Sequence, residues 1–479
     1  RLDNGLDDLW VDELHTAWVA HGDWSEVASR AAIGNQAPLY FYITKCVTSL
    51  FGLSEFTLRL PALLAGMTLC VTAGWWVKRE TGDGLAALIA LFCVAFDRTC
   101  ILYSSEARPY ALQQLVLAFL LISTLQADGR WKGFWIRSLL AAAAMHLQLT
   151  SILFLAAIYA ARCVQVVLKN EERRAAALAF LAEAALAGLL IAPLAPLFLE
   201  VSGRRDAWRA FVPTPTIFAL FTMFPWGPAL LALAAAIYAR NVEQPTAKFS
   251  LLMGLTWAGT VPALLAMILD WLGVASLFLR RYLLGDFWPI LVLPGLFLTY
   301  LRGRPKQFVA IGVVFLSLLM NAHWAPQRWK VGRLTPSRRE AWRRAVDQVR
   351  KVDPNGELPL FLVPGLIESR RLASDPDPLL REYLASPIST LYKVPHAAKD
   401  VIPLSSVTPA APSAEIVEQV ARRGGALWLI RISPQHADAW RRYALQLRQE
   451  LKSQSQDEWL LREFVKPGIV ILELRCAVR

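Results

Sequence analysis

The chain has 479 residues, of which 55% are hydrophobic, and its mean hydropathy is +0.38. Soluble proteins are typically about 45–50% apolar, and the excess here lies in long runs before residue 325. An ordinary soluble protein is therefore excluded, and the composition indicates a multi-pass membrane protein with a soluble C-terminal part. The net charge of +12 does not indicate nucleic-acid binding, because Lys and Arg cluster in short loops without a nucleic-acid-binding motif.

Residues 1–55 are predicted to form a first extracytoplasmic loop with helices in the membrane interface. The chain opens at Arg1 in a polar stretch, so we expect the membrane helix that would precede this loop to be missing. The segment "APLYFYITKCVTSLFG" (37–52) is apolar but short for a crossing, which takes about 20 residues. We interpret it as an interfacial helix with aromatic anchors, and a short tilted crossing is the alternative.

Residues 56–325 are predicted to form a transmembrane bundle, because ten apolar runs follow one another there. A helix rises about 1.5 Å per residue, so about 20 residues cross the hydrocarbon. The predicted limits are 56–77, 84–103, 110–126, 133–148, 150–168, 175–199, 216–239, 250–272, 283–301 and 306–323.

The loops between these runs predict the orientation in the membrane. Lys and Arg concentrate in alternate loops, which places those loops on the cytoplasmic side: 77–84, 128–133, 168–174, 238–248 and 301–306. The remaining loops and the C-terminal domain then lie outside. Four cations oppose this rule on the outer side and call for a functional reason: Arg204, Arg205, Arg280 and Arg281.

Residues 335–479 read as a small soluble α/β domain. Strands are predicted at 358–364, 426–432 and 468–474, and helices at 337–352, 412–425 and 436–451, with Ser413 as a cap. Residues 392–411 read as a loop. Alternating helices and strands predict a partly parallel sheet, to which no phosphate-binding motif assigns chemistry.

Three polar groups fall at ends of apolar runs on the predicted outer face. They are the acids Asp12 and Glu13 in "LWVDELHTAW" (9–18), "SSEARPY" (104–110) and "RRY" (280–282). Ionisable groups near membrane depth are costly, so they usually face a cavity or a partner. Pairing of each acid with a nearby Arg for helix packing is the structural alternative. Asp97 with Arg98 is interpreted in that way, as an ion pair near the outer leaflet.

In the order of these elements the sequence resembles the membrane glycosyltransferases of family 39, within the GT-C superfamily. That family includes protein O-mannosyltransferases and the transferases that add aminoarabinose to lipid A. The resemblance covers most of residues 1–325 and lies in five stretches in the same order: "WVDELHTAW", "QAPLYFY", "SEFTLRLPALLAG", "YSSEARPYAL" and "RRYLLGDFWP".

The resemblance implies a GT-C-like helix bundle, a polyprenyl-phosphate sugar as donor and an acceptor hydroxyl approached from outside. It implies that a first-loop acid is the catalytic base, which here is Asp12 with Glu13 beside it. The sequence departs from the family at "NQAP" (35–38), where relatives often carry charged residues before the Pro. This departure leaves the contacts to the donor phosphate and the type of sugar open.

The chemistry agrees with this resemblance. A partly desolvated carboxylate is a better base, and an anionic leaving group needs cations at the membrane surface. Glu106 is predicted to orient acceptor and donor, and Arg281 to bind phosphate. Further candidates for substrate or phosphate contacts are Arg280, Arg108, Tyr282, Tyr110 and His146. For His146, a packing role is the alternative.

We therefore predict an inverting glycosyltransferase, integral to the cytoplasmic membrane, with its active site on the extracytoplasmic face. It would move a hexosyl or pentosyl group to a protein, lipid or glycan acceptor, with membrane lipids as surroundings. No metal or other cofactor is expected, because no cluster has metal-ligand spacing. Two alternatives stay open: a transporter or flippase of a lipid or glycan, and a membrane-anchored binding protein whose soluble domain is active.

Overall fold

The structure of the chain is a computed structural model. The structure describes residues 7–477 except for 127–132, 169–172, 204–213, 239–246, 322–339, 374–376, 410, 432–433 and 456. The chain divides into two compact units. One, the bundle unit, holds the described residues of 35–43 and 59–321. The other, the sheet unit, holds those of 7–34, 44–58 and 340–477.

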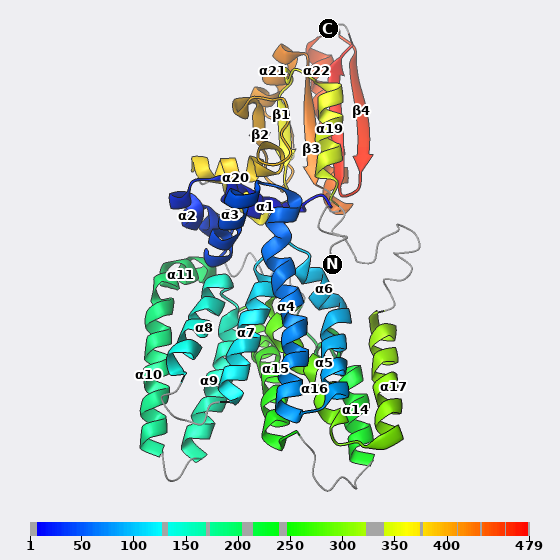
Figure 1. The fold of residues 1–479 in the computed structure, drawn as a ribbon. Helices are drawn as coiled ribbons and strands as arrows, with labels where there is room; N and C mark the ends of the chain where they lie inside the picture. Colours follow the sequence, from blue (N-terminus) through cyan, green and yellow to red (C-terminus); the bar gives the residue numbers. More distant parts are fainter. Residues whose placement is uncertain are drawn as a thin grey trace. The chain divides into compact units, whose positions relative to one another are not determined.

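The bundle unit consists of helices, and its long ones run side by side (Figure 1). Its helices are the following: α4 (Glu55–Thr81), α5 (Gly84–Phe96), α6 (Arg98–Ser104), α7 (Tyr110–Leu125), α8 (Phe134–Leu147), α9 (Ser151–Leu168), α10 (Arg173–Ile191), η3 (Ala192–Leu194), α11 (Ala195–Gly203), α13 (Ile217–Met223), α14 (Trp226–Tyr238), α15 (Phe249–Trp271), η4 (Arg280–Tyr282), η5 (Leu284–Asp286), α16 (Phe287–Leu298) and α17 (Gly303–Asn321). Each of the ten predicted runs coincides with one or more of them.

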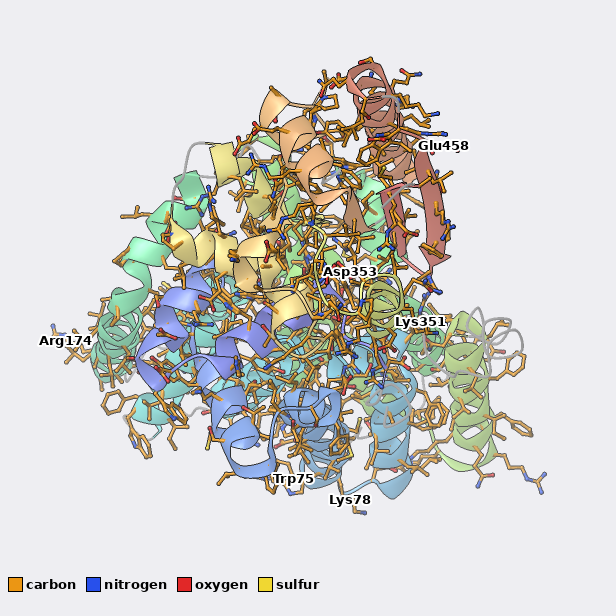
Figure 2. All side chains as sticks on the ribbon, turned by 90° about the horizontal axis from the view of Figure 1, so that it is seen from above. Trp75, Lys78, Arg174, Lys351, Asp353 and Glu458 are labelled. Atoms are coloured by element: carbon orange, nitrogen blue, oxygen red, sulfur yellow. The ribbon has the colours of Figure 1, made fainter. Side chains whose placement is uncertain are left out.

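Several of these helices have the length and composition of membrane spans. Among the described residues, four are long and apolar enough: α4, 174–203, α15 and α17. The number rises to six if the bent pairs α5–α6 and α13–α14 each count as one span. The other predicted runs form shorter apolar helices. The outward face of α4 is typical of a helix in lipid, since Trp75 is half exposed and points away from the bundle, as does Lys78 near its end (Figure 2).

The bend between α5 and α6 has a local cause. The two helices meet at 59° around Asp97, whose backbone is extended. The Asp97 Oδ1 accepts a hydrogen bond from the Cys100 N–H at 2.8 Å, so Asp97 is the N-cap of α6. The sequence interpretation of Asp97 as an ion-pair residue overlooked this role. The apolar run 84–103 is thus one hydrophobic segment but two helices.

Helix α16 is the centre of the bundle unit, because all of its residues are buried. It packs closely on α5, where a Cβ at Gly295 would lie 2.5 Å from the Ala86 carbonyl oxygen. On another side, the Trp288 ring lies 5.6 Å from the Trp76 ring of α4. Small residues therefore set the helix separation in this core, as is common in membrane bundles.

The sheet unit contains a mixed five-stranded sheet, in the order β2-β1-β3-β5-β4. Its strands are β1 (Leu360–Val363), β2 (Val401–Pro403), β3 (Gly425–Arg431), β4 (Trp459–Lys466) and β5 (Ile469–Cys476). β1 is parallel to β2 and β3, whereas β5 is antiparallel to β3 and β4. The predicted partly parallel sheet is confirmed.

Helices cover both faces of this sheet (Figure 1). Helix α19 (Trp342–Val352) lies on one face, and α21 (Ala414–Arg423) and α22 (Pro434–Gln454) on the other. The predicted ends of α21 are confirmed: the Ser413 side chain accepts from the Ile416 N–H, and Gly424 ends the helix with a left-handed backbone at φ 70°. Five elements of the described part of this domain were not predicted: η7 (Ile367–Ala373), α20 (Pro378–Ser389), η8 (Ala398–Asp400), β2 and β4, and of these η8 and β2 fall in residues 392–411, which were predicted to be a loop.

The sheet unit also includes the helices of the first loop. These are α1 (Val11–His21), η2 (Trp24–Glu26), α2 (Val27–Ile33) and part of α3 (Leu39–Phe51), the helix predicted at 37–52. Arg30 of α2 joins α1 to α20: its guanidinium lies 4.6 Å from the Trp18 ring and 3.0 Å from Glu382. The Trp18 Nε1–H donates to the same carboxylate at 2.9 Å. The first loop and the C-terminal domain therefore form one compact unit.

Candidate functional site

The acidic doublet lies in the first turn of α1, in the sheet unit. Asp12 is half-buried, whereas only 1% of Glu13 is exposed. The Glu13 Oε2 accepts a hydrogen bond from the Trp10 N–H at 3.3 Å, so Glu13 stabilises the start of its own helix. Both carboxylates are favoured there by the positive end of the helix dipole. Of the two acids, Asp12 is the more accessible to a substrate.

Two side chains from distant parts of the chain hold the backbone just before Asp12. The Val11 N–H donates to the Glu340 Oε2 at 2.9 Å, and the Leu9 N–H donates to the Tyr392 hydroxyl at 2.9 Å. Glu340 and Tyr392 were not predicted as site residues. Their sequence separations of 329 and 383 residues from their partners leave no local signal.

The stretch "SSEARPY" (104–110) forms a tight turn between α6 and α7, in the bundle unit. We call it the Glu106 turn. Glu106 and Arg108 are both 4% exposed, and the Arg108 N–H donates to the Glu106 carbonyl at 2.8 Å. The Arg108 guanidinium lies 5.9 Å from the Tyr110 ring, which in turn packs against Tyr103 with 5.1 Å between ring centroids. Three predicted site residues are thus brought together in a buried, aromatic setting.

The stretch "RRY" (280–282) forms the short helix η4, also in the bundle unit. We call this helix the basic turn. Arg280 is exposed, and Arg281 and Tyr282 are partly exposed. The Arg281 guanidinium lies 5.1 Å from the Tyr282 ring and donates to the Tyr282 hydroxyl at 3.4 Å. Arg281 and Tyr282 therefore present a cation and a hydroxyl side by side at an accessible turn.

The basic turn is tied to the helices that flank the Glu106 turn. At one end, Arg280 interacts electrostatically with the buried carboxylate of Asp97 and with Arg98, both at the bend between α5 and α6. At the other end, the Gln114 Nε2 of α7 donates to the Leu284 carbonyl at 3.0 Å. Two arginine side chains, Arg280 and Arg98, thus lie near the buried carboxylate of Asp97.

His146 has a packing contact in the structure. It lies near the end of α8, and its Nε2 is 3.0 Å from the Leu190 carbonyl of α10, to which it donates. One ring nitrogen is therefore used to join two helices, as in the packing alternative for this residue. Two of the four outer-side cations, Arg204 and Arg205, lie outside the described residues.

The predicted site residues thus fall in two different units. Seven of them lie in the bundle unit, and Asp12 and Glu13 lie in the sheet unit. Within the sheet unit, a surface cleft of about 260 Å³ is lined by Glu55, Arg343, Asp347, Arg350 and Tyr392, with Val346 and Leu391. None of the predicted site residues lines it. Over the described part of the chain, no three His, Cys, Asp or Glu residues are grouped to hold a metal ion.

Comparison with known proteins agrees with the resemblance seen in the sequence. Residues 35–199 match the family model described as dolichyl-phosphate-mannose-protein mannosyltransferase. The matched stretch includes the Glu106 turn and the bend at Asp97, whereas Asp12 and the basic turn lie outside it. No curated protein sequence gives a significant match.

The fold is similar to that of ArnT from Cupriavidus metallidurans, over 98% of this chain and 93% of that one. For the apo structure of ArnT the TM-score is 0.54 at 14% identity. For ArnT bound to undecaprenyl phosphate it is 0.57 at 13% identity. The predicted helix bundle with a small C-terminal α/β domain is thereby confirmed. Residues 35–199 of the chain thus match the mannosyltransferase family model, and the chain as a whole has a fold similar to that of ArnT.

Proposed function

We propose that this chain is an inverting glycosyltransferase that moves a sugar from a polyprenyl-phosphate donor to an acceptor hydroxyl. The observation that carries the proposal is the basic turn of the bundle unit, where Arg281 and Tyr282 stand together at an accessible position. The match of residues 35–199 to a family that uses a lipid-linked sugar supports the same chemistry. The orientation of the loops favours an active site on the extracytoplasmic face of the cytoplasmic membrane.

The basic turn is suited to the leaving group of this reaction. The donor is a phosphodiester with one negative charge, and the released polyprenyl phosphate carries about −1.5 to −2 at neutral pH. Negative charge on the phosphate therefore grows as the glycosidic bond breaks. Cations at Arg281 and Arg280, with Arg98 near Arg280, would stabilise the late charge more than the early one, which lowers the barrier.

Asp12 is proposed as the base. It would take the proton of the acceptor hydroxyl while the hydroxyl oxygen attacks the anomeric carbon. The bond from that carbon to the phosphate oxygen breaks, and its electron pair leaves with the polyprenyl phosphate. Glu13 and Glu106 are proposed to orient the substrates, and Arg108, Tyr110 and His146 to line the donor side. No metal takes part in this scheme, so chelation should leave the rate unchanged.

Purified full-length protein in detergent or lipid, supplied with polyprenyl-phosphate hexoses and pentoses, tests the proposal. Sugar transfer to a protein, lipid or glycan acceptor is followed by mass spectrometry. We expect Asp12→Asn to lower kcat by about 10²–10⁴. Asp23→Asn, at an exposed acid of the same loop, is the matched control. An Asp12→Asn protein as active as the parent would remove Asp12 from the mechanism.

The phosphate contact is tested separately. Arg281→Gln should raise the barrier by on the order of 2–4 kcal/mol, because one positive charge that stabilises the leaving phosphate is lost. Arg302→Gln, at another exposed arginine of the bundle unit, should leave the rate near that of the parent. Movement of the lipid-linked sugar across a bilayer without covalent transfer would favour a flippase instead.

A further inference from the structure

The start of α1 is held in an unusual way. The first backbone N–H groups of a helix have no partner within the helix, and Ser, Thr, Asp or Asn usually supplies one from the N-cap position. Here the N-cap is Trp10, whose side chain has no acceptor oxygen. Glu13 provides a local side-chain partner, to the Trp10 N–H. The neighbouring N–H groups of Leu9 and Val11 rely on the C-terminal domain.

The carboxylate of Glu340 is fully engaged at this point. One oxygen, Oε2, accepts from the Val11 N–H and from the Trp342 Nε1–H, both at 2.9 Å. The other, Oε1, accepts from the Arg431 Nε at 2.7 Å. Glu340 is 8% exposed and Trp342 is fully buried, so the anion is fixed between α19, β3 and α1. A carboxylate with three donors in a buried setting has one stable position.

Tyr392 provides the second tie. Its hydroxyl accepts from the Leu9 N–H at 2.9 Å and donates to the Glu55 Oε1 at 3.0 Å. Burial raises the pKa of the Tyr392 phenol, so the hydroxyl stays protonated and keeps donating. Glu55 is in turn paired with Arg343 of α19. The segment before Asp12 is thus anchored at two backbone positions to the body of the C-terminal domain.

We infer that the C-terminal domain positions the proposed base, with Glu340 and Tyr392 as positioning residues that fix the first turn of α1 and hence Asp12. This inference rests on the proposed function, because it takes Asp12 as the base. It gives the C-terminal domain, for which the sequence indicated no chemistry, a part in the reaction. A small displacement of a catalytic group lowers the rate strongly, by up to about 100-fold for 1 Å.

The test compares two pairs of variants in the full chain. Tyr392→Phe removes only the hydroxyl between Leu9 and Glu55, and Glu340→Gln leaves one oxygen where two were used. We expect kcat to fall on the order of 10-fold to 100-fold in each, with the KM for the polyprenyl-phosphate sugar within twofold of the parent. Matched controls in the same domain are Tyr443→Phe in α22 and Glu473→Gln in β5, both at buried side chains. These should keep the parent kcat.

A second measurement tests the hydrogen bonds that hold the first turn of α1. Hydrogen exchange at the amides of residues 9–13 should speed up at least tenfold in Glu340→Gln and Tyr392→Phe but not in the controls, because the first turn then opens more often. Parent-like kcat in a folded Tyr392→Phe protein, with unchanged exchange at residues 9–13, would overturn the inference. If Glu340→Gln does not fold, Tyr392→Phe decides alone. An inactive parent would instead refute the proposed function, while the exchange data would still test the anchor.

Discussion

The two units stabilise their charges in opposite ways, and a three-residue ion cluster in each unit shows the difference. In the bundle unit, Glu183 of α10 faces two arginines from neighbouring helices. Its Oε2 lies 2.7 Å from Arg137 and 3.5 Å from Arg162, and the three side chains are at most 3% exposed. The cluster joins α8, α9 and α10 away from water, so each charge depends on the others.

The cluster of the sheet unit has one arginine and two acids, and its acids are partly exposed to water. Arg30 lies 3.0 Å from both Glu26 and Glu382, and these two acids keep 43% and 49% of their side chains exposed. Water screens the two acids from each other and solvates them when the arginine moves. The same kinds of residue are therefore expected to matter greatly in one unit and modestly in the other.

The largest expected effect is at Glu183. Glu183→Gln removes the negative charge that both buried guanidinium groups contact, so the free energy of unfolding should fall by about 3–5 kcal/mol. Thermal unfolding in detergent measures the change. Glu80→Gln, near the end of α4 where Glu80 accepts from Gln126, is the matched control and should be close to neutral.

A triple substitution tests the same prediction by restoring the lost stability. Replacing Glu183, Arg137 and Arg162 together by leucine or methionine should recover most of the lost stability, because apolar residues of similar volume replace buried ion pairs well in many proteins. Unchanged stability in Glu183→Gln would mean that the arginines find another anion or that water reaches them, and the contrast between the two units would be lost.

An intermediate effect is expected where α16 packs on α5. Gly295→Ala places a Cβ 2.5 Å from the Ala86 carbonyl oxygen, and since this neighbour is backbone it cannot rotate away. We expect a loss of about 1–3 kcal/mol. Gly188→Ala in α10 meets no atom within 4 Å and should stabilise its helix by up to about 1 kcal/mol. Equal effects of the two substitutions would contradict close packing of α16.

A smaller effect is expected at Glu382, the exposed counterpart of Glu183. Glu382→Gln removes the charge that faces Arg30 but keeps an oxygen to accept from the Trp18 Nε1–H. The loss should be about 0.2–1 kcal/mol and should shrink further in high salt. A loss as large as that at Glu183, or one that salt does not reduce, would show that the contact is not screened.

Sequence reasoning succeeded where the cause of a structure is local. Each apolar run became helical because its composition alone favours a helix in lipid. The ends of α21 were predicted because Ser413 and Gly424 act within their own turn. By contrast, β4 was missed because charged residues such as Arg462 and Glu463 interrupt its apolar pattern, as suits an edge strand. The three-residue β2 gives too short a pattern to detect.

The candidate site shows the same division. The arginines and acids were found because charges next to apolar runs stand out in the sequence. Their supports were not found, because Glu340 and Tyr392 belong to a domain that begins more than 300 residues after α1. Asp97 carried a second signal that was overlooked: aspartate is a favoured N-cap residue, so its position inside a long apolar run is consistent with a break between two helices.

The smallest expected effect is a pH dependence of the stability of the sheet unit. In the sheet unit, the His396 Nε2 lies 3.2 Å from the Asp353 Oδ2. Burial lowers the pKa of His396 below 6.5, although Asp353 and Asp400 act in the opposite direction. Between the two pKa values the unfolded chain therefore binds more protons than the folded one, so stability is full above about pH 6.5 and falls as the pH drops through the folded-state pKa. In His396→Gln this decline should be shallower, whereas the exposed His21→Gln should follow the parent. Unfolding curves of the sheet unit between about pH 8 and pH 5 measure it, and equal slopes in parent and His396→Gln would assign the acid sensitivity to other groups.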